Sequence, residues 1–149
     1  MALDDFVRQL RQIEIFQLLT PEALRLIAFS AENRILQPGD VLFQEGEPAD
    51  SGIIILGGAL TLTNSSSGDE KQRVGTGALV GEMALILETK RTATAIASEI
   101  TGILRVPRAL FQRVLHEFPD CARKLRDYLM HRTSDVTATL ALYRQDYPQ

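Results

Sequence analysis

The residues best suited to bind a charged ligand lie between Gly81 and Thr94. Gly81 and Glu82 precede a short apolar stretch that can form a helical turn, and the first amides of a helix lack partners inside it. Such amides attract an anion, and the planar guanidinium of Arg91 can close over the same anion. Glu82 only accepts hydrogen bonds, so it suits a hydroxyl group of that ligand. The stretch therefore indicates a ligand that carries a phosphate close to a ribose hydroxyl.

Other interpretations of the reactive residue types are weaker. Glu82 and Arg91 could instead form a structural ion pair at the rim of a barrel. His116 and His131 fall in terminal helical segments and not on strands, so we expect no metal site. No Ser-His-Asp or Cys-His set can be assembled, so we expect no catalytic residues, no enzymatic activity and no cofactor besides the ligand.

The composition is that of one ordinary globular domain. Of the 149 residues, 45% are apolar and 23% are charged, and a chain of this length can enclose its own core. The net charge of −3 argues against a general binder of the nucleic-acid backbone, which needs a basic face. The N-terminal residues lack the order of a signal peptide, no apolar run reaches the length of a membrane span, and Cys121 is the single cysteine. We therefore expect a single cytoplasmic domain over residues 1–149, without a membrane span.

Residues 1–30 are predicted to form two helices. Residues 3–15 carry apolar side chains along one helical face. Thr20 can then cap a second helix whose first position is Pro21 and which ends near Ser30. This segment contains no cluster of titratable side chains, so we interpret it as packing.

Residues 33–107 change to short apolar strands separated by glycine-rich turns. The predicted strands are residues 33–36, 41–43, 52–56, 59–63, 70–75, 92–97 and 102–106. Gly57 and Gly58 predict a tight hairpin loop between the strands that flank them. About eight short strands with regular turns are typical of an antiparallel barrel or a jelly roll, and spacing does not distinguish these two.

The last section, residues 108–149, is predicted to be helical. One helix spans 108–117, and Pro119 begins a longer helix that reaches about Tyr143, or about 37 Å at 1.5 Å per residue. Apolar side chains recur along this helix in a heptad-like stripe. The length favours a homodimer seam through residues 119–143, and a lid that lies on its own barrel is the alternative.

Three segments stand in order along the chain and together point to a known family. They are residues 38–43 followed by Glu45-Gly46, residues 53–60, and the cassette of residues 81–94. Together they resemble the cyclic nucleotide-binding domain family, the regulatory module of catabolite-activator type regulators, cyclic-nucleotide-dependent kinases and gated channels. The resemblance runs from about Phe16 to Pro119 and then, more loosely, along the long helix, and it implies a mainly β fold with flanking helices. The expected architecture is an antiparallel β jelly roll with N-terminal helices and a long C-terminal helix.

The resemblance implies that the cassette holds a 3′,5′-cyclic purine nucleotide, either cAMP or cGMP. By the family pattern, Glu82 would accept a hydrogen bond from the ribose 2′-hydroxyl, and Arg91 would pair with the cyclic phosphate. The amides near Ala84 and Leu85 would bond the phosphate oxygens. The ligand-binding residues implied in this way are Gly81, Glu82, Met83, Ala84, Leu85, Arg91, Thr92, Ala93 and Thr137.

The purine contacts implied by the resemblance are less complete. Thr92 stands where cGMP-responsive members often carry threonine, but members that bind both nucleotides have it too. Catabolite-activator-like members cap the purine with a hydroxyl pair from the long helix, and counting along this chain assigns Thr137 to one of them. The cassette also has Glu88 and Lys90 where the family often has glycine and proline. Lys90 adds positive charge near the phosphate, and a solvated Glu88 is favoured over one that points inward.

These observations favour a non-enzymatic sensor that signals by movement of its C-terminal helix to an unknown effector protein. The alternative is a ligand-free scaffold or dimerisation domain of the same fold with a degenerate pocket. No helix-turn-helix is recognisable after the long helix, so we expect no DNA-binding element. A third possibility is that the chain is one piece of a larger regulator, channel or enzyme.

Overall fold

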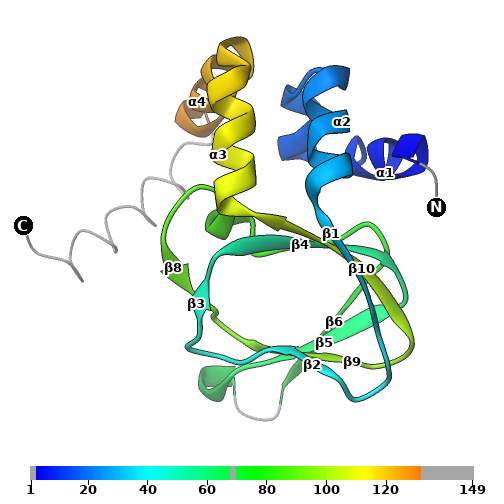
Figure 1. The fold of residues 1–149 in the computed structure, drawn as a ribbon. Coiled ribbons are helices and arrows are strands. Elements are labelled where there is room, and N and C mark those ends of the chain that lie inside the picture. The colour runs from blue at the N-terminus through cyan, green and yellow to red at the C-terminus, as the bar shows by residue number, and fades with distance from the viewer. Residues whose placement is uncertain (1–2, 68–69, 132–149) are drawn as a thin grey trace, which may run out of the picture.

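The computed structural model describes residues 3–67 and 70–131, and it begins with helices that cover one face of a sheet (Figure 1). These are α1 (Leu3–Leu10), the short 3-10 helix η1 (Glu14–Leu18) and α2 (Pro21–Ser30). The helix predicted over residues 3–15 therefore ends early, at Leu10. The predicted cap is present, because the Ala23 amide donates to Thr20 Oγ1 at 3.2 Å.

Two four-stranded antiparallel sheets and a two-stranded ribbon form the body of the molecule, which confirms the predicted jelly-roll class. The first sheet has the order β1 (Glu32–Leu36), β10 (Thr101–Pro107), β4 (Ser51–Gly57) and β7 (Leu79–Val80). The second sheet has the order β2 (Val41–Phe43), β9 (Thr94–Ala97), β5 (Ala59–Thr63) and β6 (Lys71–Gly75). The ribbon pairs β3 (Pro48–Ala49) with β8 (Thr89–Lys90). A 3-10 turn, η2 (Ser65–Ser67), follows β5.

The hairpin predicted at Gly57 and Gly58 is wrong. Strand β4 pairs with β10 and β7, whereas β5 pairs with β6 and β9, so the chain changes sheets between these strands. Gly58 has φ +87°, and a methyl group on it would lie 2.4 Å from the carbonyl oxygen of Ile100. The glycine is needed for a close crossing from one sheet to the other, and a two-residue sequence signal cannot distinguish such a crossing from a hairpin.

Two hydrophobic cores lie on the two faces of the first sheet. On the face toward the second sheet, Ile53, Ile55 and Ile103 pack with residues of β2, β5 and β9. On the opposite face, Ile54 and Leu104 pack under the helices. Strands with both faces covered read as continuous apolar runs, as residues 53–56 do.

The segment between β7 and β9 is held against the loop after β2. It contains the 3-10 helix η3 (Glu82–Leu85) and the ribbon strand β8. The Arg91 amide donates to the Glu47 carbonyl at 2.8 Å, and the Gly46 amide donates to the Arg91 carbonyl at the same distance. These backbone bonds fix the position of Arg91, which lies directly after β8.

The chain continues into α3 (Arg108–Glu117), as predicted, and then into α4 (Pro119–His131). The rest of the helix predicted to reach residue 143, with Thr137, lies outside the described residues. Within residues 3–67 and 70–131, no helix combines the length and the apolar character needed to cross a membrane.

Candidate functional site

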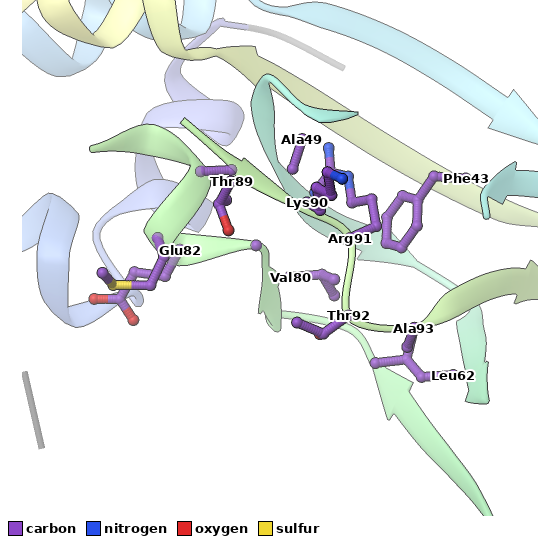
Figure 2. A pocket seen from close by; sticks show the side chains of 13 residues that line it. Phe43, Ala49, Leu62, Val80, Glu82, Thr89, Lys90, Arg91, Thr92 and Ala93 are labelled. Carbon is purple, nitrogen blue, oxygen red and sulfur yellow. The ribbon is translucent and has the colours of Figure 1, made fainter. Parts of the chain in front are cut away.

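A pocket of about 300 Å³ opens beside η3 and β8 (Figure 2). Its walls come from four separate parts of the chain: strands β2, β3 and β5, and the segment from Val80 of β7 to Ala93. The lining residues are Phe43, Ala49, Leu62, Val80, Gly81, Glu82, Met83, Ala84, Thr89, Lys90, Arg91, Thr92 and Ala93. The volume lies at the lower end of the range of small-molecule sites.

Gly81 shapes the floor of this pocket. Its backbone is left-handed, with φ 82° and ψ 40°, and this turn starts η3. A methyl group at Gly81 would lie only 2.6 Å from Nη1 of Arg91 and 3.2 Å from the carbonyl oxygen of Ser51. The absence of a side chain therefore brings the start of η3 into close approach with the guanidinium group.

Arg91 is a buried cation, and the described residues satisfy only part of its hydrogen-bonding capacity. Its exposed fraction is 8%, and Nη2 donates to Oγ of Ser51 at 3.1 Å. Its Cζ lies 4.3 Å from the centre of the Phe43 ring. Nη1 is buried and has no hydrogen-bond partner among the described residues. A buried donor without an acceptor is costly, and such groups in native folds point to a missing ligand or to a functional role.

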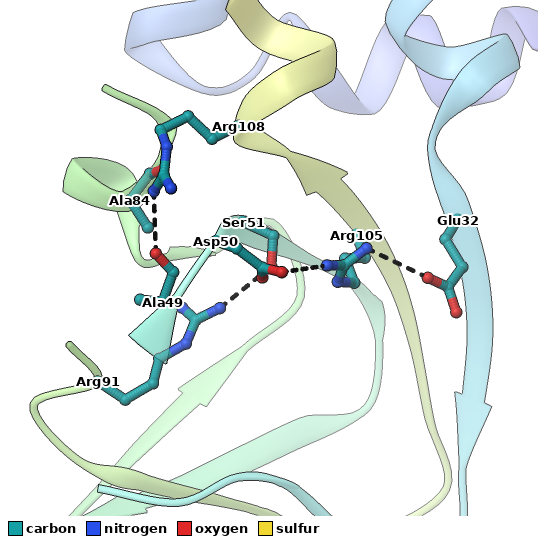
Figure 3. Close-up of polar contacts among 8 residues, drawn as sticks. All are labelled: Glu32, Ala49, Asp50, Ser51, Ala84, Arg91, Arg105 and Arg108. Atoms are coloured by element: carbon teal, nitrogen blue, oxygen red, sulfur yellow. Dashed lines mark hydrogen bonds and ion pairs between the residues drawn. The ribbon is translucent and has the colours of Figure 1, made fainter. Parts of the chain in front are cut away.

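Charged side chains, among them those of Asp50 and Arg105, lie to one side of Arg91 (Figure 3). Burial lowers the pKa of Arg91 from its ordinary value, and the attraction of Asp50 opposes this effect. Asp50 forms an ion pair with Nη2 of Arg105 at 3.0 Å, and Nη1 of the same arginine forms an ion pair with Glu32 at 3.4 Å. Partial burial opposes ionisation of Asp50, but Arg105 and local hydrogen bonds outweigh it and lower the pKa of this carboxyl.

The structure brings together most of the site residues predicted from the sequence. Gly81, Glu82, Met83, Ala84, Arg91, Thr92 and Ala93 all line the pocket. Figure 2 shows Glu82 on the side of the pocket formed by η3, apart from Arg91 and Phe43. Leu85 does not line it, because its fully buried side chain packs in the core under the helices.

Glu88 and Lys90, the two cassette residues that differ from the usual family pattern, face different hollows of the surface. Lys90 is exposed and lines the pocket, where it adds positive charge. Glu88 is exposed and lines a separate groove against α3, so its carboxylate does not face the pocket. The solvated Glu88 expected from the sequence is therefore confirmed.

Several residues that line the pocket or contact Arg91 lie outside the predicted cassette. Phe43 and Ser51 contact the Arg91 guanidinium, yet they precede it by 48 and 40 residues (91 − 43 and 91 − 51). Phe43 belongs to one of the segments that resembled the family, but nothing in its sequence context indicated contact with Arg91. Pairings between strands that are distant in sequence, together with the backbone bonds between Arg91 and the loop after β2, bring these residues together.

Arg108, the first residue of α3, joins the back of the cassette to the C-terminal helices. Its Nη1 donates to the carbonyl oxygens of Leu87 at 2.9 Å, Ala49 at 3.0 Å and Ala84 at 3.2 Å. Its amide donates to the Asp50 carbonyl at 2.7 Å. One side chain therefore connects η3, the ribbon and α3 (Figure 3).

Replacing Arg108 with methionine should lower the free energy of unfolding by about 2 kcal/mol, because three carbonyl groups lose a charged donor. Urea denaturation measures this change. The matched control is Arg113→Met on the same helix; within the described residues its exposed side chain makes one ion pair, at 3.9 Å to Glu117. That control should change stability by less than about 0.5 kcal/mol. Equal losses in both variants would contradict a connecting role for Arg108.

Comparison with known proteins identifies the fold and its family. The family model described as "Cyclic nucleotide-binding domain" matches residues 33–118. A cyclic nucleotide-binding-like protein from Brucella abortus is 43% identical with a TM-score of 0.69, and the match covers 76% of this chain and 99% of that one. The N-terminal domain of a transcriptional regulator from Streptomyces coelicolor is 28% identical with a TM-score of 0.75, covering 83% and 91%.

A longer protein also matches over part of its length. Neuropathy target esterase sws of Drosophila persimilis is 33% identical over 100 residues, which make up 65% of this chain and 7% of that protein. The chain thus spans a small fraction of the curated relatives it matches, and their names do not define its activity. The family model covers more than half of the chain and includes the whole pocket. The chain belongs to the cyclic nucleotide-binding domain family.

Proposed function

We propose that this protein is a non-enzymatic sensor that binds a cyclic mononucleotide, cAMP or cGMP, in the pocket between η3 and Phe43. The observation that carries the proposal is the buried Arg91 guanidinium, whose Nη1 has no partner in the described part of the chain and lies against Gly81. A cyclic phosphate would supply the missing acceptor. The amides at the start of η3 would supply donors on the other side of the same phosphate.

The rest of the proposed ligand fits the other groups of the pocket. Glu82 would accept from the ribose hydroxyl, since a carboxylate has no proton to donate. Leu62, Thr92 and Ala93 also line an adjoining hollow of about 240 Å³, which has the polar side chains of Lys71 and Gln72 on its wall. We place the purine there, next to the Thr92 hydroxyl.

The signal is proposed to leave through the C-terminal helices. Arg108, the first residue of α3, donates to the carbonyl oxygens of Ala84 and Leu87. A ligand that pulls η3 toward Arg91 would therefore also move the groups that Arg108 binds. Such a ligand shifts the helices only if it binds one of their arrangements more tightly than the other. Dimer formation through residues 119–143, a purine contact from Thr137 and a cytoplasmic location belong to the same proposal.

Calorimetric titration of the whole chain with cAMP and with cGMP tests the function. We expect heat of binding with at least one nucleotide, and 5′-AMP, which lacks the cyclic phosphate, should bind more weakly. At a ligand concentration about a hundred times the Kd, the free energy of unfolding should rise by about 2.7 kcal/mol. Absence of heat and of thermal stabilisation at millimolar concentration of either nucleotide would leave the ligand-free scaffold as the better explanation.

A further inference from the structure

Phe43 contacts the cassette arginine from outside the cassette. Its ring centre lies 4.3 Å from Cζ of Arg91, and both side chains are 8% exposed. A guanidinium over an aromatic face is attracted by the ring quadrupole, and this attraction is strongest where water is excluded. The contact therefore offsets part of the cost of burying Arg91.

A ring holds a cation in a different way from an acid. A carboxylate partner would neutralise the guanidinium charge and occupy its N–H donors, which an incoming anion needs. The face of Phe43 does neither, and Ser51 takes only Nη2. Nη1 is left without an acceptor among the described residues and lies against Gly81, where η3 begins.

Asp50, the first of two acids that attract Arg91, is held by another cation. Asp50 attracts Arg91, but its carboxylate bonds Arg105 at 3.0 Å. Arg105 is in turn shared with Glu32 at 3.4 Å. The negative charge of Asp50 is thus partly neutralised by Arg105, as Figure 3 shows. The ring of Phe43, in contrast, contacts the Arg91 guanidinium directly.

Phe43 is itself fixed by the fold. It lies at the end of β2, pairs with Ala95 of β9, and packs in the core between the two sheets with residues such as Ile53 and Leu60. The same side chain lines the pocket. A ring that is rigid on the core side and faces Arg91 on the other side sets the plane of the guanidinium.

We propose that Phe43 is a positioning residue: its ring holds Arg91 in the orientation that presents Nη1 and the undiminished charge to the bound anion. This inference rests on the proposed function, since it assigns a support for the arginine that binds the phosphate. It adds a residue that lies outside the cassette and whose contribution is electrostatic and not only steric.

The first test measures affinity for cAMP and cGMP by calorimetry in variants of the whole chain. Phe43→Leu should weaken binding about tenfold, since a desolvated cation–π contact is lost. Because this variant can also lose stability, 4-fluoro- and 3,4,5-trifluorophenylalanine are placed at the same position. Fluorine withdraws electron density from the ring with little change in shape, so affinity should fall stepwise along the series. A flat series would overturn the electrostatic role.

The matched control is Phe16→Leu. Phe16 is fully buried in the other core, where its ring packs edge-on against Phe111 at 6.0 Å. This variant should lose stability while its affinity stays that of the unmodified protein. An equal loss of affinity in Phe16→Leu and Phe43→Leu would mean that Phe43 acts only through general stability, and the proposal would be withdrawn.

A ligand-free measurement separates this inference from the proposed function. In NMR spectra of the protein alone, the Hη and Hε protons of Arg91 should show an upfield ring-current shift that disappears in Phe43→Leu. Persistence of the shift overturns the positioning role whether or not nucleotide binds. If Arg91→Ala abolishes binding while the Phe43 variants keep full affinity, the proposed function stands and this inference fails. If the shift behaves as expected but neither nucleotide binds, the proposed function fails and the positioning of Arg91 stands.

Discussion

Arg91→Ala is expected to weaken binding of cAMP or cGMP about a hundredfold. Hydrogen bonds to a charged group contribute about 1.5–3 kcal/mol each, and the planar guanidinium can make more than one to a phosphate. A loss of about 2.7 kcal/mol corresponds to a factor of a hundred. Calorimetric titration measures the change directly. Arg25→Ala, at an exposed arginine on α2, is the control that removes one positive charge without touching the pocket.

Replacing Arg91 should weaken nucleotide binding without lowering the stability of the ligand-free protein. The charged guanidinium of Arg91 is buried, and its Nη1 has no hydrogen-bond partner in the described residues. Burial disfavours the charged form of this side chain. Arg91→Met keeps an unbranched side chain of similar length without the charge. The free energy of unfolding in the absence of ligand should then stay level or rise by about 1 kcal/mol. A fall of about 2 kcal/mol or more, with nucleotide affinity unchanged, would show that Arg91 is a structural cation.

The parts of the fold that the sequence predicted well are those with strong local punctuation. Strands 41–43 and 59–63 and helix 108–117 begin and end as predicted, because proline, glycine or a polar loop stands at their ends. The cassette was predictable for a similar reason. Its residues lie within 14 consecutive positions (81 to 94), so their spacing in sequence reflects their spacing on η3 and β8.

Apart from the early end of the first helix at Leu10, the main errors and omissions depend on contacts between distant segments. Gly57-Gly58 is compatible with a hairpin and with a crossing between sheets, and only the packing of Gly58 against Ile100 decides between them. Phe43 lies in β2 and Ser51 in β4, and neither strand pairs with β8, which ends directly before Arg91. Local propensity carries no information about which apolar residue lies under a buried cation.

Gly81→Ala should nearly abolish nucleotide binding, with an affinity loss of about a hundredfold or more. Two effects combine at this residue. A left-handed backbone costs an alanine about 1 kcal/mol relative to glycine. In addition, the new methyl group would lie 2.6 Å from Nη1 of Arg91, so the guanidinium must leave its place above Phe43. Displacing Arg91 removes the charged bonds to the phosphate, which is why the expected loss equals that of removing its side chain.

Gly77 separates the two effects. Its backbone is also left-handed, with φ +89°, but a methyl group there would meet nothing within 4 Å. Gly77→Ala should therefore lower the free energy of unfolding by about 1 kcal/mol and leave nucleotide affinity unchanged. Gly81→Ala should lose somewhat more stability and, unlike Gly77→Ala, its binding. If both variants bind equally well, the close approach of Gly81 to Arg91 has no part in ligand recognition. If only Gly81→Ala loses binding, the missing side chain at Gly81 is a requirement of the site itself, because backbone strain is common to both glycines.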